Sequence, residues 1–412
     1  MIGLENFNHK LNSSPIIKRE RIMSKYIHLF KTKAEFRDAY LNHYEEPWLS
    51  CTEDTGKVSF NKRKPTLKDP FTIEFYGDGV ISWNIGNRTV LCSKNKGEWQ
   101  SMTGNFQIQV VNGDTLEFLG DNENYSGCSI NTGVKYVAFG NINSLISSNN
   151  FENIEALTSE ETFKELFKLS RLVSAERLIL PATTLSSNCY NGMFRNCTEL
   201  VTAPTLPATT LADYCYKGMF EGCTSLTVAP ELPATTLATS CYDGMFYSCM
   251  SLVIAPKLLA TTLALRCYGS MFRKCKGLTT APELPATTLA NYCYDSMFYE
   301  CSSLITAPKL PATSLKSNCY TSMFYGCRNL TIAPELPAIT LVPSCYNLMF
   351  YNCKNLSYIK AMFTTKPASS YTQMWVSGVK AIGTFVKNSE ATWDVTGNNG
   401  VPTGWTVETA DA

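Results

Sequence analysis

Hydrophobic positions in the second half of the chain recur every 26 residues. From Leu180 the pattern continues without an insertion through seven copies to Ala361, and the second copy reads LPATTLADYCYKGMFEGCTSLTVAPE. Repeats of this length fold as stacked units, because a single unit cannot bury its apolar face alone. The pattern therefore predicts a solenoid of seven repeats over residues 180–361.

Each copy predicts one short helix and one short strand. The apolar side chains of the Cys-Tyr-x-x-Met-Phe segment fall within one arc of about 140° when residues advance by 100°, as they do in a helix. In the second copy, Thr209 and Thr210 precede this segment and are suitable N-cap residues. Residues 226–229 then predict a strand that Pro230 closes. Stacked copies would align these strands in a parallel sheet with a spacing of about 4.8 Å.

The segments that flank the repeats predict caps for the ends of the solenoid. Residues 147–179 are expected to be the N-terminal cap, because a capping signature at residues 158–161 is followed by Phe163, Leu166 and Phe167 at helical spacing. Residues 362–412 contain Trp375, Trp393 and Trp405 among several glycines. This composition predicts a small β-rich C-terminal cap.

The first part of the chain predicts a separate β-rich domain over residues 23–146. Short alternating segments are separated by turn signals, and they lie at residues 71–76, 80–83, 89–93, 106–111, 115–119 and 135–139. A strand at residues 26–30 and a helix after the capping box at Thr32 are expected before them, and residues 1–22 are expected to be a disordered extension. The predicted fold class is therefore α+β, with a β-sandwich-like domain followed by the solenoid.

Charge and hydropathy narrow the range of partners. The chain carries 36 Lys and Arg against 35 Asp and Glu, a net charge of +1, which produces no long-range field toward nucleic acid. No apolar run approaches the roughly 18 residues that a membrane span needs, and residues 1–23 lack the apolar core of a secretory signal. We expect no nucleic-acid partner and no membrane span.

Residues that carry chemistry are scarce. The three histidines, His9, His28 and His43, all lie near the N-terminus, and no Ser-His-Asp, HExxH or P-loop arrangement is present. The loop at residues 121–124 gathers oxygen ligands that Ca²⁺ prefers, but it lacks the spacing of an EF-hand and is more simply a solvated turn. We expect a protein that is not an enzyme and that uses no cofactor and no metal.

Fourteen of the 17 cysteines form seven Cys-x7-Cys pairs, one in each copy. Two residues eight apart on a helix are separated by about 12 Å, which is too far for a disulfide. No CxxC is present, so the spacing does not indicate a zinc ribbon either. We predict that these cysteines are reduced and belong to the core.

Charged residues alternate in sign at the last position of successive copies. These residues are Glu231, Lys257, Glu283, Lys309 and Glu335. Alternation is notable in a chain with only 17% charged residues, and stacking would place opposite charges one rung apart. We predict a charge ladder that fixes the register of the copies.

The consensus CYxxMFxxCxxLxxAPxLPATTL resembles the leucine-rich repeats of the BspA type, whose units carry an aromatic-x-x-Cys-x-x-Leu core. The resemblance covers residues 160–363 and implies a leucine-rich-repeat solenoid. Such repeats occur in surface proteins of gut and oral anaerobes and in phage tail-associated proteins of Bacteroidales, and their shared property is binding. The SKNKGEW turn resembles part of a module that accompanies the same repeats.

This resemblance implies a non-catalytic binding or adhesion protein that recognises a host or cell-surface protein or glycan through its solenoid. Secreted members carry export signals, and residues 1–23 show none. The alternative is therefore a structural or receptor-binding component of a bacteriophage tail. The expected location is a cell surface or a phage particle.

Two positions of each copy point away from the predicted buried arc: the residue before the first Cys and the residue after the Phe. They are seven apart and would be superposed on a helix. Tyr and Arg, which are enriched at binding hot spots, recur there. The predicted binding ridge consists of Tyr214, Tyr247, Arg266, Arg273, Tyr292, Tyr299, Tyr325 and Tyr351. Two other interpretations stay open: the tyrosines cover neighbouring helices, or the strand face with Thr227, Thr279, Thr280 and Thr306 is the binding surface.

Overall fold

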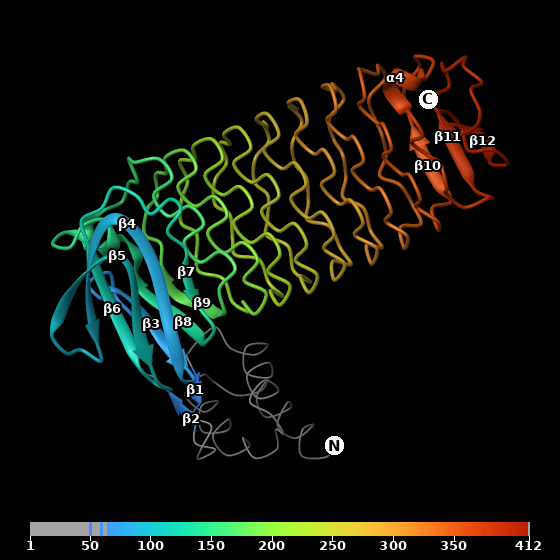
Figure 1. Ribbon diagram of the computed structural model, residues 1–412. Helices are drawn as coiled ribbons and strands as arrows, with labels where there is room; N and C mark the ends of the chain where they lie inside the picture. The colour runs from blue at the N-terminus through green and yellow to red at the C-terminus, as the bar shows by residue number, and fades with distance from the viewer. Residues whose placement is uncertain (1–48, 52–57, 61–63, 411–412) are drawn as a thin grey trace, which may run out of the picture. The chain divides into compact units, whose positions relative to one another are not determined.

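The computed structural model describes residues 49–51, 58–60 and 64–410 (Figure 1). The chain divides into two compact units, Met1–Pro65 and Thr66–Ala412. In the first unit, β1 (Leu49–Cys51) and β2 (Val58–Phe60) form an antiparallel pair. The extension predicted at residues 1–22, the strand at 26–30 and the helix after Thr32 lie outside the described residues.

The second unit begins with one mixed sheet of seven strands. Its strands are β3 (Phe71–Tyr76), β4 (Gly79–Lys94), β5 (Trp99–Val110), β6 (Thr115–Gly120), β7 (Ile130–Thr132), β8 (Lys135–Asn141) and β9 (Leu172–Ile179). The order is β5-β4-β6-β3-β8-β9, and β7 pairs with β4. All of these pairs are antiparallel except β8 with β9, which are parallel.

The prediction of a β-sandwich-like domain is wrong, because these strands belong to one sheet and not to two sheets packed face to face. The two segments predicted at residues 80–83 and 89–93 are one strand, β4, which continues through a shift of register between Asn84 and Thr89. Gly86 has a φ of 59° within this irregularity. A glycine there bends the strand without ending it, which is the usual role of a β-bulge.

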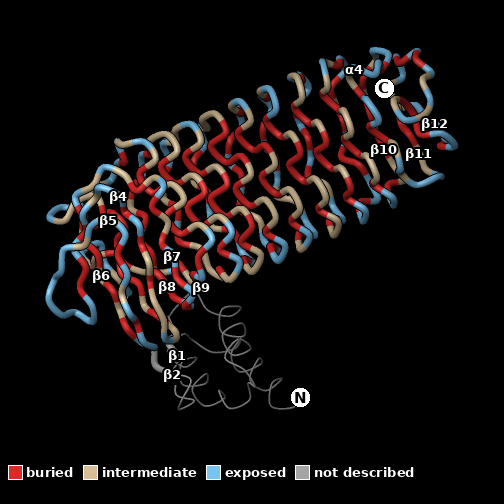
Figure 2. Tube along the Cα trace, in the orientation of Figure 1, coloured by how far each residue is buried: buried red, intermediate tan, exposed pale blue. Residues whose placement is uncertain are grey.

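The 26-residue copies form coils that lie one on another (Figure 1). Equivalent side chains stack from coil to coil: the ring centroids of Tyr216 and Tyr242 are 5.8 Å apart, and those of Phe220 and Phe246 are 5.6 Å apart. The core is continuous with that of the first sheet, since Tyr125 stacks on Phe163 and Phe163 stacks on Tyr190. Figure 2 shows the buried residues as a band that runs through all the coils.

The segment predicted as a helix in each copy is a series of turns, which we call the turn segment (residues 214–223 in the second copy). Its backbone N–H groups alternate between two kinds of partner. Met219 N donates to Tyr216 O in the same coil at 3.2 Å, whereas Phe220 N donates to Met245 O in the next coil at 2.9 Å. Every fourth residue has a positive φ, as at Tyr214 (60°) and Gly218 (56°). A right-handed helix has neither feature.

The predicted α+β fold with a leucine-rich-repeat solenoid is therefore wrong: the structure is nearly all β, with 3% helix and 24% strand. In the described residues the helical segments are η2 (Ile142–Leu145), η3 (Phe151–Asn153) and α4 (Ser369–Thr372). The strand expected at residues 226–229 is reduced to an isolated bridge between Val228 and Ile254. The physical reason for the error is the four-residue period of the buried positions. Four residues advance a helix by about 400°, so over two turns this period is nearly the same as that of an amphipathic helix.

The C-terminal end holds a second sheet of three parallel strands, β10 (Tyr358–Ala361), β11 (Thr384–Lys387) and β12 (Thr406–Thr409). The indole N–H of each nearby tryptophan donates to a backbone oxygen: Trp375 to Gly400 at 3.0 Å, Trp393 to Phe363 at 3.1 Å, and Trp405 to Lys380 at 2.8 Å. All three side chains are buried, so they close the last layer of the core.

The fourteen repeat cysteines are free and buried, which confirms their prediction as core residues. Burial raises the pKa of the thiol at both positions of the pair, to about 12 at Cys189 and at Cys197. No helix in the described part of the chain is long and apolar enough to cross a membrane.

Candidate binding face of the repeats

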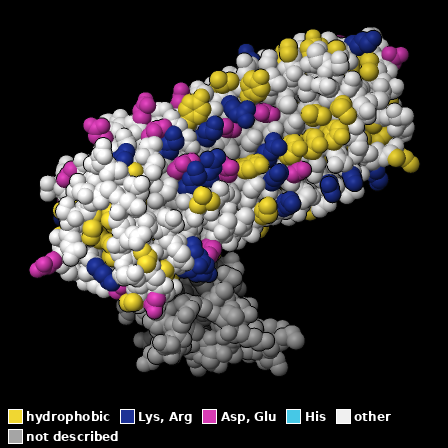
Figure 3. Space-filling model, viewed as in Figure 1, with side chains coloured by type: hydrophobic (Ala, Val, Ile, Leu, Met, Phe, Trp, Pro, Cys, Tyr) yellow, Lys and Arg dark blue, Asp and Glu magenta, His cyan; other side chains and the backbone are white. Residues whose placement is uncertain are grey.

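A column of large polar side chains runs along the turn segments, at the position that follows the buried Phe of each copy. We call it the Tyr/Arg column, and its members are Arg195, Glu221, Tyr247, Arg273, Tyr299, Tyr325 and Tyr351. Most of them are half-buried. Figure 3 shows charged side chains gathered over the earlier coils of one face and yellow side chains, a class that includes tyrosine, over the later coils.

The later members of the column stack closely. The ring centroids of Tyr299 and Tyr325 are 4.3 Å apart, with an angle of 8° between the ring planes. Those of Tyr325 and Tyr351 are 4.7 Å apart, with an angle of 15°. The guanidinium of Arg273 lies 3.8 Å from the centre of the Tyr299 ring. These contacts are shorter than the 5.7 Å between the buried Phe272 and Phe298 rings. The tyrosines therefore cover one another's faces and leave their edges and hydroxyl groups for solvent or a partner.

The predicted ridge is divided in the structure. Its members after the Phe belong to the Tyr/Arg column, whereas Tyr214, Arg266 and Tyr292 precede the first Cys and take positive φ values of 60°, 53° and 58°. Without a helix, a separation of seven residues does not superpose the two positions. Tyr292 is 40% exposed, and the ammonium of Lys217 lies 5.4 Å from the centre of the Tyr214 ring.

Two groups of ion pairs connect neighbouring coils on the side of the turn segments. Arg195 contacts Glu221 at 2.9 Å and Glu165 at 3.2 Å. In a second group, Asp243 accepts from Arg266 at 3.2 Å and from Lys217 at 3.3 Å, and Arg266 also reaches Asp295 at 3.3 Å. Burial raises the pKa of Asp295, and the charge of Arg266 opposes this effect.

Gly269 makes room for the second group. A Cβ atom at this position would lie 2.7 Å from Cγ of Arg266 and 2.9 Å from Oδ1 of Asp243. Asp243 and Asp295 hold the equivalent place one coil before and one coil after Gly269. The absence of a side chain at Gly269 therefore lets Arg266 lie between the two carboxylates.

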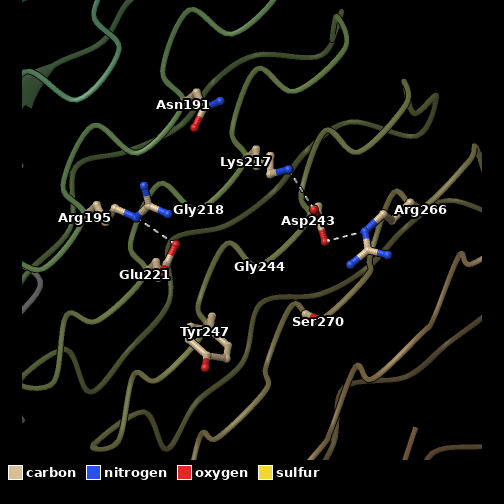
Figure 4. Close-up of a pocket in the computed structure, with 10 residues that line it drawn as sticks. All are labelled: Asn191, Arg195, Lys217, Gly218, Glu221, Asp243, Gly244, Tyr247, Arg266 and Ser270. Atoms are coloured by element: carbon tan, nitrogen blue, oxygen red, sulfur yellow. Dashed lines mark hydrogen bonds and ion pairs between the residues drawn. The ribbon is translucent and has the colours of Figure 1, made fainter. Parts of the chain in front are cut away.

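A pocket of about 210 Å³ lies between these two groups of ion pairs (Figure 4). Its walls include Arg195, Glu221 and Tyr247 from the Tyr/Arg column and Lys217, Asp243 and Arg266 from the second group. Gly218 and Gly244 also line it and have φ values of 56° and 62°. Predictions from the sequence named Tyr247 and Arg266 but missed Lys217 and Asp243. The signal that could have found them is that both charged residues occupy the same position of the 26-residue period, two residues after the first Cys of their copies.

The predicted charge ladder lies on the surface. All five of its members are exposed, and the ion pairs within 4.0 Å among the described residues include none between successive members. Glu335 pairs instead with Lys360 of β10 at 3.0 Å. A role in register through weaker, longer-range attraction stays a prediction.

The alternative binding surface, on the predicted strands, is also exposed. Thr227, Thr279, Thr280 and Thr306 all face solvent. Exposed aliphatic side chains interrupt them, including Ile254 at 57% and Ile332 at 60%. In the loop at residues 121–124, Asp121 accepts hydrogen bonds from the backbone and hydroxyl of Ser148 at 2.7 Å and 2.8 Å, which is a structural role.

No family model matches the chain, and no curated protein matches it.

Proposed function

We propose that the protein is a non-catalytic binding protein that recognises a protein or a glycan on a cell surface. Recognition would use the surface formed by the turn segments of the repeats, which we call the turn face. The observation that supports this most directly is the Tyr/Arg column. Its residues vary from copy to copy, from Glu221 to Arg273 to Tyr325, while the buried Cys, Tyr, Met and Phe positions beside them do not change. Variation over a constant core is what a recognition surface needs.

The chemistry of the column favours recognition. Tyr and Arg supply large contact areas that combine apolar surface with hydrogen-bonding groups, and they dominate binding hot spots. Arg273, Tyr299 and Tyr325 are held against one another by stacking. A partner that binds them has little side-chain entropy to remove, so more of the contact energy contributes to affinity. The resemblance to BspA-type repeats supports the same kind of function.

The stacking also indicates how a partner would approach. The faces of Tyr325 are covered by Tyr299 and Tyr351, so a sugar ring cannot stack on them. The edges and hydroxyl groups form a continuous strip instead. We therefore expect an extended partner that lies along the column and hydrogen-bonds to several coils.

The test is attachment to target cells and to a glycan and protein array by the full chain with Tyr299, Tyr325 and Tyr351 changed to Ala. We expect attachment to weaken at least 30-fold, as the loss of about 2 kcal/mol at a hot spot predicts, with little change in the melting temperature. The matched control replaces the exposed Thr227, Thr279 and Thr306 by Ala. If the tyrosine variant still attaches and the threonine variant does not, the binding surface is the threonine face and the proposal for the turn face is wrong.

The alternative, a component of a bacteriophage tail, requires the same surface recognition and differs in the particle that carries it. Mass spectrometry of purified virions would find the chain only if this alternative is correct.

A further inference from the structure

The first three copies carry glycine at the middle position of the turn segment, and two of these glycines form the floor of the pocket between the two groups of ion pairs. At the third, Gly192, the Glu165 side chain occupies the space, 3.2 Å from where a Cβ atom would lie. Gly218 and Gly244 occupy the middle position of the turn segment, and the next three coils have Ser270, Ser296 and Ser322 there. All five residues have a φ between 52° and 62°. The backbone conformation is thus the same, and what the glycines add is space.

The side chains around this space are fixed in place. Arg195 is held by Glu165 and Glu221, and Arg266 is held by Asp243 and Asp295, with separations of 2.9–3.3 Å. Lys217 is held by Asp243 at 3.3 Å, and Asp243 itself is buried. Figure 4 shows the side chains that line the pocket, from Arg195 and Glu221 to Asp243 and Arg266, around Gly218 and Gly244. A ligand would meet preorganised donors and acceptors, which lowers the entropic cost of binding.

The charges around the pocket are already compensated. Each cation has at least one carboxylate partner, so a ligand carboxylate or ammonium would have to compete with an existing ion pair. A neutral hydroxyl group has no such competition. It can accept from a second N–H of a guanidinium and donate to a free lone pair of a carboxylate, and such charge-assisted hydrogen bonds are strong.

One wall of the pocket is aromatic. The Tyr247 side chain lines the space beside Gly244, where a Cβ atom would meet only Cβ of Tyr247, at 3.9 Å. A sugar ring presents hydroxyl groups around its edge and C–H groups on its face, so it matches polar walls combined with one aromatic ring. A volume of about 210 Å³ suits one such ring and not a longer peptide side chain together with its backbone.

We propose that the pocket lined by Arg195, Lys217, Glu221, Asp243, Tyr247 and Arg266 binds one neutral sugar ring. This inference rests on the proposed function, since it makes a glycan the partner and assigns one of its residues to a defined subsite. The neighbouring stacked tyrosines would then contact the rest of the glycan through their edges.

The experiment is saturation-transfer NMR on the full chain with the methyl glycosides of glucose, galactose, mannose and N-acetylglucosamine, and with glucuronate and glucosamine as charged counterparts. We expect at least one neutral glycoside to bind, and to bind better than either charged sugar. Gly244→Ser should weaken this binding at least tenfold, because the hydroxymethyl group enters the pocket. The protein should still fold, since serine occupies the equivalent place at Ser270 with a φ of 52°.

Two further variants keep the inference testable. Glu221→Gln preserves volume but removes one charge-assisted acceptor, and it should also weaken binding. Ser296→Gly is the matched control two coils away and should leave binding unchanged. The inference is wrong if no neutral glycoside binds, if a charged sugar binds best, or if Gly244→Ser folds and binds as well as the wild type.

Failure of the inference is distinguishable from failure of the proposed function. If the wild type attaches to cells, the tyrosine variant does not, and no glycoside binds, the proposed function stands and the sugar subsite is wrong. If the wild type attaches to neither cells nor arrays, and no glycoside binds, the proposed function itself is overturned.

Discussion

The thiol of Cys223 donates to the main-chain oxygen of Phe194, one coil earlier, at 3.1 Å. The same bond recurs along the stack: Cys249 donates to Phe220 at 3.1 Å and Cys275 to Phe246 at 3.0 Å. The second cysteine of each pair is thus a small core residue that also satisfies a buried carbonyl oxygen. The Phe194 oxygen also accepts from the backbone N–H of Cys197 in its own coil at 3.0 Å. The thiol of the next coil therefore supplies the second hydrogen bond of a carbonyl oxygen that can accept two.

This arrangement predicts that the thiols are unreactive in the folded protein. Burial raises the pKa of Cys301 to about 12, so the reactive thiolate is scarce at pH 8. Titration with a thiol reagent should find almost no reactive groups among the repeat cysteines in the native protein. After denaturation without reductant, close to all 17 cysteines should react. A count of only a few after denaturation would indicate disulfides and would contradict the free cysteines of the structure.

The turn geometry predicts that replacing Leu169 by glycine increases the stability of the protein, whereas glycine substitutions usually decrease it. This residue is 68% exposed and has a φ of 61°. In the left-handed region a side chain costs about 1–2 kcal/mol, which glycine avoids, although glycine gains entropy in the unfolded chain. Leu169→Gly should therefore stabilise the protein by roughly 0.5 kcal/mol. In a right-handed helix the same change would destabilise the protein by about 1 kcal/mol.

Urea denaturation of the two proteins measures this difference. Leu91→Gly, at an exposed position of β4, is the control and should destabilise the protein, since glycine weakens a strand. Destabilisation by Leu169→Gly of the same size as by Leu91→Gly would contradict the turn conformation.

The raised pKa of Glu74 should make the stability of the protein depend on pH. Burial on β3 raises the pKa of Glu74 from 4.5 to about 7, and the charge of Arg177 opposes the rise. Between these two values the folded chain holds a proton that the unfolded chain has lost. The free energy of unfolding should therefore fall by roughly 2–3 kcal/mol as the pH rises from about 4.5 to about 7.

Glu74→Gln removes this titration and should flatten the pH profile over that range, with a higher melting temperature at pH 8 than the wild type. The exposed Glu98→Gln serves as the control and should leave the slope in place. An unchanged slope in Glu74→Gln would mean that other groups produce the pH dependence.

The sequence predicted the strands of the first sheet correctly where hydrophobic and polar residues alternate within one short segment. The segment predicted at residues 71–76 is β3 with the same bounds, and the segment at 115–119 lies within β6. The pairing of β4 through its bulge at Gly86 was not readable, because Asn and Gly signal a turn in the sequence whether or not the strand continues.

The turn segments illustrate a different limit. Their buried positions repeat every four residues, which suits a helix and a chain of turns equally well over eight residues. The distinguishing signal is the middle position, where Gly218, Gly244, Ser270 and Ser296 are small residues and where the structure has a positive φ. The pocket could not be predicted either, because the contact of Asp243 with both Lys217 and Arg266 depends on how neighbouring coils stack.

The hydrogen bonds of the turn segments have a consequence for how the molecule can change in length. Tyr216 N donates to Cys241 O, and Tyr242 N donates to Cys267 O, so each coil is bonded to its immediate neighbours. At the two ends of the stack, Ser174 of β9 pairs with Thr202 of the first copy, and Tyr358 of β10 pairs with Ile332 of the sixth copy. Unequal recombination within the repeated coding sequence would add or remove whole coils and leave both ends intact. The length of the stack can therefore change in steps of one copy.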